Sequence, residues 1–339
     1  MLVSVIILNW NNIDIICDCI SSVLKQDYAP LELFVIDNNS GDGSREKIRS
    51  EFPEIKLIEN STNLGFCKAN NNVISRSKGE FVLLLNADVI IEQDYVKEMV
   101  KAAQSSEKIG SAAGKLLKLD PDNRKTDIID STGHLLTKSF CPFNRGQREK
   151  DRGQYNVQEN VFGTTGAAAL YRKKMLEDTK INGEYFDELF FAFYEDTDLD
   201  WRAQLFGWRC VFTSKAVAYH YRGGSVKGAD RKWIHKHYFK NRYMMVFKNA
   251  TLDLMLRNMH HIILFEIASF IELILAPYLM FSIFTFLKYL PQILIKRGII
   301  QKRRRVASKE IGKFLVCIEF KKRFRNRLNS YRQMIFSKG

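Results

Sequence analysis

Phe81-Val-Leu-Leu-Leu-Asn86-Ala-Asp88 is the stretch of sequence that decides the fold. Its five apolar residues in a row predict a strand that is buried on both faces, as the strands of parallel sheets are. The apolar run stops at Asn86, and Asp88 follows two residues later. An ionised carboxylate at the end of a buried strand costs free energy unless it has a partner, and open α/β sheets bind ligands beyond the carboxyl ends of their strands. Asp88 therefore predicts a divalent cation that holds phosphate groups, with capping of the next helix as the alternative role.

The residues before this stretch alternate between strands and helices. Apolar runs at 2–8, 31–36 and 55–58 predict three further strands, each followed by a polar turn and a helix. The turn at residues 37–44 is rich in glycine and asparagine, as turns that need a positive φ are. The repeated order of strand and helix predicts an α/β fold with parallel strands.

Two common phosphate-binding loops are not found in this part of the sequence. No G-x-G-x-x-G pattern follows the first strand, so the dinucleotide fingerprint is missing. Gly110 to Lys115 resembles a P-loop, but only three residues separate its two glycines. If the chain binds a phosphate group, we expect a metal ion at Asp88 to hold it.

An acidic cluster follows a run of aromatic residues in the second half of the chain. Glu195, Asp196 and Asp198 lie at the predicted start of a helix that Gly207 ends. Carboxylates favour a first helical turn for electrostatic reasons alone. Apolar surroundings, however, raise the pKa of a carboxylate and suit it to remove a proton, so the cluster is a candidate for a general base. Arg202 on the same helix either contacts a phosphate or pairs with Asp198.

Three other features leave two interpretations open. His220 ends an apolar strand and precedes a Gly-Gly pair, which suits a metal or phosphate ligand as well as a structural histidine. The small residues of Gly163-Thr-Thr-Gly166 permit either close approach of a ligand or tight packing of strands. The polar stretch at 120–160 predicts hairpins and loops over the site.

The tail of the chain is strongly basic. From Thr251 onward, 17 Lys and Arg residues face 5 Asp and Glu residues, so this segment carries +12 of the net charge of +14. Its longest uncharged run, Leu273 to Leu287, is shorter than the ~20 residues that a spanning helix needs, and Pro277 interrupts it. We therefore expect interfacial helices at 260–305 on an anionic membrane surface, with basic residues from Lys296 to Arg305 beside them. A true span, or a helical contact between copies of the chain, is the alternative.

The cysteines and the N-terminus bear on the compartment. The six cysteines are scattered and form no C-x-x-C pair, which favours a reducing environment. The first residues enter a strand at once, without a charged region or a cleavage site, so a signal peptide is not expected. We expect a cytoplasmic protein, peripheral on the cytoplasmic face of the plasma membrane.

Several motifs together resemble a family 2 (GT-A type) glycosyltransferase, and the later ones resemble its bacterial rhamnosyltransferase-like branch. The match covers roughly residues 1–250 in the order of the family. The motifs are Val3–Asn11, Val35–Ser44, Asn63–Phe66, Leu84–Asp88, Gly166–Arg172, Tyr194–Arg202 and His220. The resemblance implies a GT-A (Rossmann-like) mixed sheet flanked by helices at 1–250. The rest of the chain, 251–339, is then an amphipathic, basic helical extension.

The resemblance also implies roles for single residues. Asp37 would hydrogen-bond the pyrimidine of a nucleotide-sugar, and Asp88 and His220 would bind Mg²⁺ or Mn²⁺. Asp196 would be the general base, with Glu195 as the runner-up. Asn86-Ala-Asp88 stands where many relatives have Asp-x-Asp, and one charge fewer suggests weaker metal affinity. The predicted donor-binding residues are Asn9, Asn11, Asp37, Asn39, Asn63, Gly65, Phe66, Asn70, Asn86, Ala87 and Arg202.

The activity implied is an inverting transfer of a sugar to a hydroxyl group, with dTDP-rhamnose as the suggested donor. The membrane-facing tail suggests a lipid-linked saccharide acceptor in cell-surface polysaccharide assembly, and nucleic acid is not an expected partner. A sugar nucleotidyltransferase is one rival, although such enzymes want a basic, glycine-rich loop where this chain has Asn9-Trp-Asn-Asn12. A non-enzymatic binder of membrane or nucleic acid through the basic tail is another. The enzyme hypothesis requires Asp37, Asp88 and Asp196 to meet in one cleft.

Overall fold

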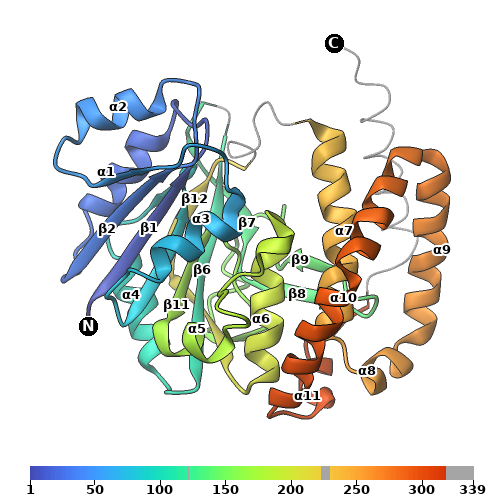
Figure 1. Cartoon of the computed structure of the whole chain (residues 1–339). Helices are drawn as coiled ribbons and strands as arrows, with labels where there is room; N and C mark the ends of the chain where they lie inside the picture. Colours follow the sequence, from blue (N-terminus) through green and yellow to red (C-terminus); the bar gives the residue numbers. More distant parts are fainter. Residues whose placement is uncertain (121, 223–229, 318–339) are drawn as a thin grey trace.

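A mixed sheet of ten strands forms the centre of the molecule (Figure 1). The structure is a computed structural model, and it describes residues 1–120, 122–222 and 230–317. The Gly-Gly pair after Arg222 and the tail from residue 318 therefore lie outside the described residues. Half of the sheet is parallel, in the order β3-β2-β1-β4. These strands are β1 (Val3–Asn9), β2 (Leu31–Asp37), β3 (Leu57–Glu59) and β4 (Phe81–Asn86).

The other half of the sheet is mixed. β11 runs antiparallel to β4 and to β6, whereas β12 runs parallel to β6. The parallel arrangement predicted from the alternation of strands and helices therefore holds only up to β4. The mixed sheet that the family resemblance implied is confirmed. The remaining strands of this sheet are β5 (Val89–Ile91), β6 (Ile109–Leu119), β7 (Lys125–Ser131), β10 (Glu159–Val161), β11 (Ala168–Arg172) and β12 (Arg209–His220).

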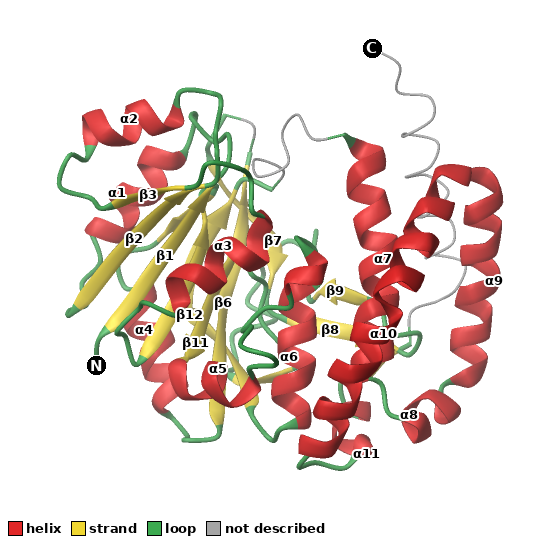
Figure 2. Cartoon of the chain, in the orientation of Figure 1, coloured by secondary structure: helices red, strands yellow, loops and turns green. Residues whose placement is uncertain are grey.

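Helices cover both faces of the sheet (Figure 2), so β4 is buried on both sides as its apolar run predicted. Val82 and Leu84 join the core on one face, and Leu83 and Leu85 join the core on the other, because successive side chains of a strand alternate. All six cysteines, each within the described residues, are free, as their spacing predicted. The helices of this part are α1 (Ile16–Leu24), α2 (Ser44–Glu51), α3 (Gly65–Ile74), α4 (Tyr95–Gln104), α5 (Lys173–Thr179), η1 (Glu188–Phe190) and α6 (Glu195–Leu205).

A group of helices stands at one end of the molecule, where α7, α9 and α10 lie side by side (Figure 1). β13 (Leu315–Val316) returns from this group to pair with β8 (His134–Thr137), whose other neighbour is β9 (Pro142–Asn144). The division of the chain at residue 250 stays a prediction, and the helices after it pack on the part before it. The helices are α7 (Arg231–Asn249), α8 (Leu252–Arg257), α9 (Met259–Leu275), η3 (Pro277–Leu279), α10 (Met280–Arg303) and α11 (Ser308–Gly312).

Buried ion pairs join the helical group to the sheet domain. Lys296 of α10 is 5% exposed, and its Nζ lies 2.7 Å from Asp187 Oδ1, just before η1. Lys248 of α7 also pairs with Asp187, and its Nζ lies 2.9 Å from Asp198 Oδ2. Burial raises the pKa of Asp187, but the two lysines outweigh burial and hold it below its usual range. The expectation that Lys296 belongs to a membrane-facing basic run is therefore wrong, because its charge is used inside the protein.

Candidate active site

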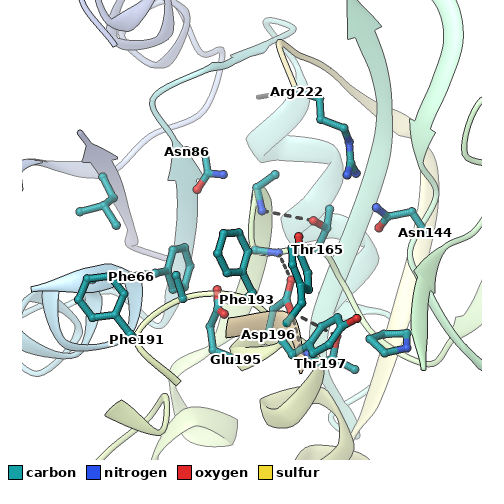
Figure 3. A pocket seen from close by; sticks show the side chains of 18 of the residues that line it. Phe66, Asn86, Asn144, Thr165, Phe191, Phe193, Glu195, Asp196, Thr197 and Arg222 are labelled. Carbon is teal, nitrogen blue, oxygen red and sulfur yellow. Dashed lines mark hydrogen bonds between the residues drawn. The ribbon is translucent and has the colours of Figure 1, made fainter. Parts of the chain in front are cut away.

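A cavity of about 500 Å³ opens beyond the carboxyl ends of β1, β2 and β4, a size typical of ligand sites (Figure 3). Eight residues predicted from the sequence line it, drawn from four separate stretches of the chain. In Figure 3, Asn86 and Arg222 lie in the upper part of the cavity and Glu195 and Asp196 in the lower part. The predicted residues that line it are Asn63, Gly65, Phe66, Asn86, Asp88, Glu195, Asp196 and His220.

Asp37 is not among the described residues that line the cavity, so the predicted meeting of three carboxylates is reduced to Asp88 and Asp196. Its side chain is fully buried and holds the loop after β2. Asp37 accepts hydrogen bonds from Asn9 Nδ2 at 3.0 Å and from the backbone N–H of Ser40 at 2.9 Å. The next residue, Asn38, reaches the cavity in its place.

The other predicted residues outside the cavity shape loops or fill the core. Asn11 and Asn39 take the left-handed backbone conformation that asparagine tolerates, with φ of 56° and 65°. Asn70 donates a hydrogen bond to the carbonyl of Phe66 at 2.9 Å, and Ala87 is fully buried. Among the described residues, these positions therefore support the cavity without lining it, as Asn9 does.

Arg202 does not contact the cavity, which corrects the expectation of a phosphate or acceptor contact. Its guanidinium is 1% exposed and donates hydrogen bonds to the carbonyls of Thr179 at 2.7 Å and Tyr185 at 2.8 Å. Its Nε lies 3.2 Å from Asp198 Oδ2, the pairing that the sequence analysis held as the alternative. Arg202 thus fixes α6 in the core.

His220 lies between two carboxylates at the edge of the cavity. The antiparallel pairing of β12 with β5 places His220 opposite Val89, and so next to Asp88. His220 Nε2 lies 3.4 Å from Asp88 Oδ1, and Nδ1 lies 2.9 Å from Asp130 Oδ2. Burial lowers the pKa of His220, but Asp88 and Asp130 outweigh burial and raise it to about 9. Arg222 also pairs with Asp130, its Nε 2.7 Å from Oδ1.

Asp88 and His220 offer a limited but suitable ligand set for a divalent cation. Mg²⁺ and similar ions are commonly held by one or two protein ligands together with substrate phosphates and water. Asp130 orients the imidazole from behind, as carboxylates do for metal-binding histidines. No group of three or more His, Cys, Asp or Glu side chains suited to a metal occurs within the described ranges. The residues therefore fit a cation that a diphosphate helps to hold, and His220 must lose its proton to bind it.

The two adjacent carboxylates of α6 differ in their surroundings. Glu195 is buried, and its Oε2 has no hydrogen-bond partner among the described residues. Burial, followed by repulsion from Asp196, raises the pKa of Glu195 well above its ordinary value. Asp196 accepts hydrogen bonds from the backbone N–H groups of Gly166 at 2.9 Å and Thr197 at 2.6 Å. These hydrogen bonds hold Asp196 in place, whereas the raised pKa of Glu195 favours its protonated form, so Asp196 is the better placed base.

A strained loop leads into this acidic pair. Phe191, Phe193 and Tyr194 all have a positive φ, between 67° and 73°, which costs free energy for residues other than glycine. Asn241 of α7 holds the loop, since its Nδ2 lies within hydrogen-bond distance, at 2.8–3.1 Å, of three backbone carbonyls, those of Phe190, Ala192 and Phe193. Gly65 packs so closely on Phe191 that a Cβ there would lie 2.7 Å away. The sequence gives no local signal for this loop.

Other residues of the cavity were not predicted. Trp233 and Tyr238 of α7 line it. His134 also lines it, within the polar stretch at 120–160 that the sequence predicted to lie over the site. The remaining unpredicted lining residues include Trp10, Asn38, Phe143, Asn144, Gln147, Thr165, Phe193 and Arg222.

Comparison with protein families gives a match over more than half of the chain. The model for "Glycosyl transferase family 2" matches residues 4–180. The N-acetylglucosaminyl-diphospho-decaprenol L-rhamnosyltransferase of Mycobacterium tuberculosis is 26% identical over 58% of this chain and 68% of its own length. The Sinorhizobium fredii protein y4gI is 24% identical over 66% of this chain, and the match spans 25% of that longer protein.

Solved structures share the architecture at low sequence identity. Staphylococcus aureus TarS 1-349, crystallised with UDP-GlcNAc, matches with a TM-score of 0.55 and 18% identity, over 98% of this chain and 92% of that one. The mannosyltransferase PcManGT of Pyrobaculum calidifontis, crystallised with GDP-Man and Mn²⁺, matches with a TM-score of 0.52 and 14% identity, over 99% and 88%. These likenesses show that the fold is of the GT-A type.

Proposed function

The chain belongs to glycosyl transferase family 2, and from this membership we propose that it transfers a sugar from a nucleotide-sugar to a hydroxyl group of an acceptor saccharide. The observation that carries the proposal is the meeting of Asp88 and Asp196 in one cavity at the carboxyl ends of the strands. Each carboxylate lies on a separate element. One can serve the leaving diphosphate while the other serves the attacking hydroxyl.

The geometry suits an inverting displacement. Asp196 accepts the proton of the acceptor hydroxyl. The oxygen of that hydroxyl forms a bond to the anomeric carbon of the donor sugar, while the bond from this carbon to the nucleoside diphosphate breaks. Arg222 presents positive charge at the same cavity, which favours the departing phosphate. Bound Mg²⁺ or Mn²⁺, held by Asp88 and His220, would neutralise further charge on the diphosphate. A covalent intermediate would need a separate nucleophile as well.

The proposed donor is dTDP-rhamnose, and the proposed acceptor is a lipid-linked saccharide. The rhamnosyltransferase-like motifs support this choice, as does the name of the mycobacterial relative, which specifies a diphospho-decaprenol acceptor. We place the reaction at the cytoplasmic face of the plasma membrane, in cell-surface polysaccharide assembly.

A panel of nucleotide-sugars tests the proposal. We expect the purified full-length chain to release nucleoside diphosphate from one donor of the panel, with dTDP-rhamnose first among those tried. Incubation with a sugar 1-phosphate and a nucleoside triphosphate is the parallel assay. Pyrophosphate release in that assay, without hydrolysis of any nucleotide-sugar, would support the nucleotidyltransferase alternative instead.

The outer face of α9 supports a membrane surface as a partner. Its exposed side chains are apolar, with Ile263, Ile267, Phe270 and Ile274 between 52% and 64% exposed. Of its two carboxylates, Glu272 is buried, and the partly exposed Glu266 pairs with Arg242 at 2.9 Å. This polarity is the reverse of that of a helix in water, and it suits a lipid interface. Within the described residues, one helix, Pro277–Arg303, is long and apolar enough to cross a membrane. Because much of the nearby basic run pairs inside the protein, we propose surface association driven mainly by these apolar side chains.

Substitution of two outward residues of α9 tests this surface. Phe270→Asp with Ile274→Asp should weaken binding to vesicles of phosphatidylcholine and phosphatidylglycerol about 100-fold. Burial of each large apolar side chain contributes about 1.5–3 kcal/mol to the free energy of binding. A difference of about 1.4 kcal/mol corresponds to a tenfold change in the dissociation constant. Val157→Asp is the matched control, since Val157 is 73% exposed on the sheet domain and should not affect binding. Vesicle binding by the double variant equal to that of the wild type would contradict the proposal. If the double variant binds vesicles normally but no longer forms a dimer, the face contacts a second copy of the chain.

A further inference from the structure

We propose that His134 is a positioning residue for the general base, whose imidazole, placed between Asp200 and Asp196, orients Asp196 for the acceptor hydroxyl. The inference rests on the proposed function, because it concerns how Asp196 acts as a base. His134 would act through Asp196, without taking the acceptor proton itself.

The geometry places one imidazole between two carboxylates of α6. His134 Nε2 lies 3.7 Å from Asp196 Oδ2, and Nδ1 lies 3.4 Å from Asp200 Oδ2. Asp196 and Asp200 are one helical turn apart, so a single side chain can bridge them. His134 is 6% exposed and Asp200 is 2% exposed, and charges in such surroundings interact more strongly than in water.

The segment Gly163–Gly166 seats both carboxylates. The backbone N–H of Thr164 donates to Asp200 Oδ2 at 3.0 Å, and a Cβ at Gly163 would lie 1.8 Å from that oxygen. The backbone N–H of His134 donates to the carbonyl of Gly163 at 2.8 Å, so the same segment also places the imidazole. The absence of a side chain at Gly163 therefore makes room for the carboxylate of Asp200, and not for a ligand.

The charges around His134 favour a protonated imidazole. The groups that face it are Asp196 and Asp200 from α6 and Arg222 from the end of β12. Burial lowers the pKa of His134, but the two carboxylates outweigh burial and Arg222 and raise it above its ordinary value. Burial also raises the pKa of Asp200 to about 7. The surroundings of His134 therefore shift its imidazole toward the positively charged form.

Kinetics of His134→Gln test the inference. We expect kcat to fall roughly 10- to 100-fold and the donor Kd to stay unchanged. This loss is smaller than the full contribution of a positioned general base, which is about 10²- to 10⁴-fold. Because the substitution removes a group that favours positive charge beside the base, the acid limb of the kcat profile should move to higher pH. Asp200→Asn should shift the acid limb in the same direction, because it removes the carboxylate that faces Nδ1 of His134. A packing role alone would lower kcat equally at every pH. The control is Asp127→Asn, at an exposed surface pair, which should change neither value.

Nuclear magnetic resonance gives a second readout that needs no turnover. The imidazole signal missing from His134→Gln identifies His134, and its titration midpoint should fall in Asp196→Asn and in Asp200→Asn. An unchanged midpoint in both variants, or an unchanged kcat and acid limb in His134→Gln, would overturn the inference. If the wild-type chain turns over no nucleotide-sugar, the proposed function fails, and the midpoints still decide whether His134 is coupled to Asp196.

Discussion

Asp196→Asn lowers the turnover number by roughly 10²-fold or more, because general base catalysis supplies at least about that factor. The amide keeps the shape of the carboxylate, and its single oxygen can still accept from one of the two backbone N–H groups, of Gly166 or Thr197, that contact separate oxygens of Asp196. The fold and the donor site should therefore be preserved. Turnover is measured by release of nucleoside diphosphate, and the donor Kd by isothermal titration calorimetry, which we expect to be unchanged.

Glu195→Gln is the matched comparison on the neighbouring residue. Because burial raises the pKa of Glu195 and favours its protonated form, its replacement by a neutral amide of the same shape changes the charge of the site little. We expect a loss below about tenfold, well short of the factor that a base supplies. If Asp196→Asn retains full turnover while Glu195→Gln loses it, the base is Glu195.

Asp88→Ala removes the dependence of donor binding on the divalent cation. Asp88 is the carboxylate of the two-residue ligand set, and His220 alone is a weak partner for a hard cation that prefers oxygen. In calorimetry, Mn²⁺ should strengthen binding of the nucleotide-sugar to the wild-type chain and leave its binding to the variant unaffected.

Asp127→Ala serves as the control for this experiment, since its carboxylate is 55% exposed in a surface pair with Lys150. It should respond to Mn²⁺ as the wild type does. Donor binding that Mn²⁺ strengthens equally in Asp88→Ala would remove the metal role from Asp88. Donor binding independent of Mn²⁺ in the wild type would show that His220 and Arg222 carry the diphosphate without a cation.

The local patterns of the sequence predicted the parallel half of the fold and much of the cavity. The uninterrupted apolar run of β4 required burial on both faces, and its end placed Asn86 and Asp88 at the cavity. The aromatic residues before Glu195 and Asp196 pointed to a carboxylate in apolar surroundings; Glu195 is buried without a partner for its Oε2 among the described residues, whereas Asp196 accepts backbone hydrogen bonds. These features depend on neighbours in the chain, which a sequence displays directly.

The missing parts depend on contacts between distant segments. Asp130 is 90 residues from His220, and only the pairing of the strands brings them to 2.9 Å. Arg202 looked available for a substrate because its partners, the carbonyls of Thr179 and Tyr185, belong to the backbone and leave no trace in the pattern of residue types. Asp37 is likewise held by the protein itself, since one of its oxygens accepts from the side chain of Asn9 on β1 and the other from the backbone N–H of Ser40.

The pairing of β13 with β8 has a consequence for synthesis of the protein. β8 begins at His134, yet Leu315 must be present before it can lie beside Leu136 and complete that small sheet. On the ribosome, the segments that line the cavity emerge long before this last strand does. The chain should therefore become catalytically active only late in translation. Nascent chains that end before Leu315 should be released without catalytic activity.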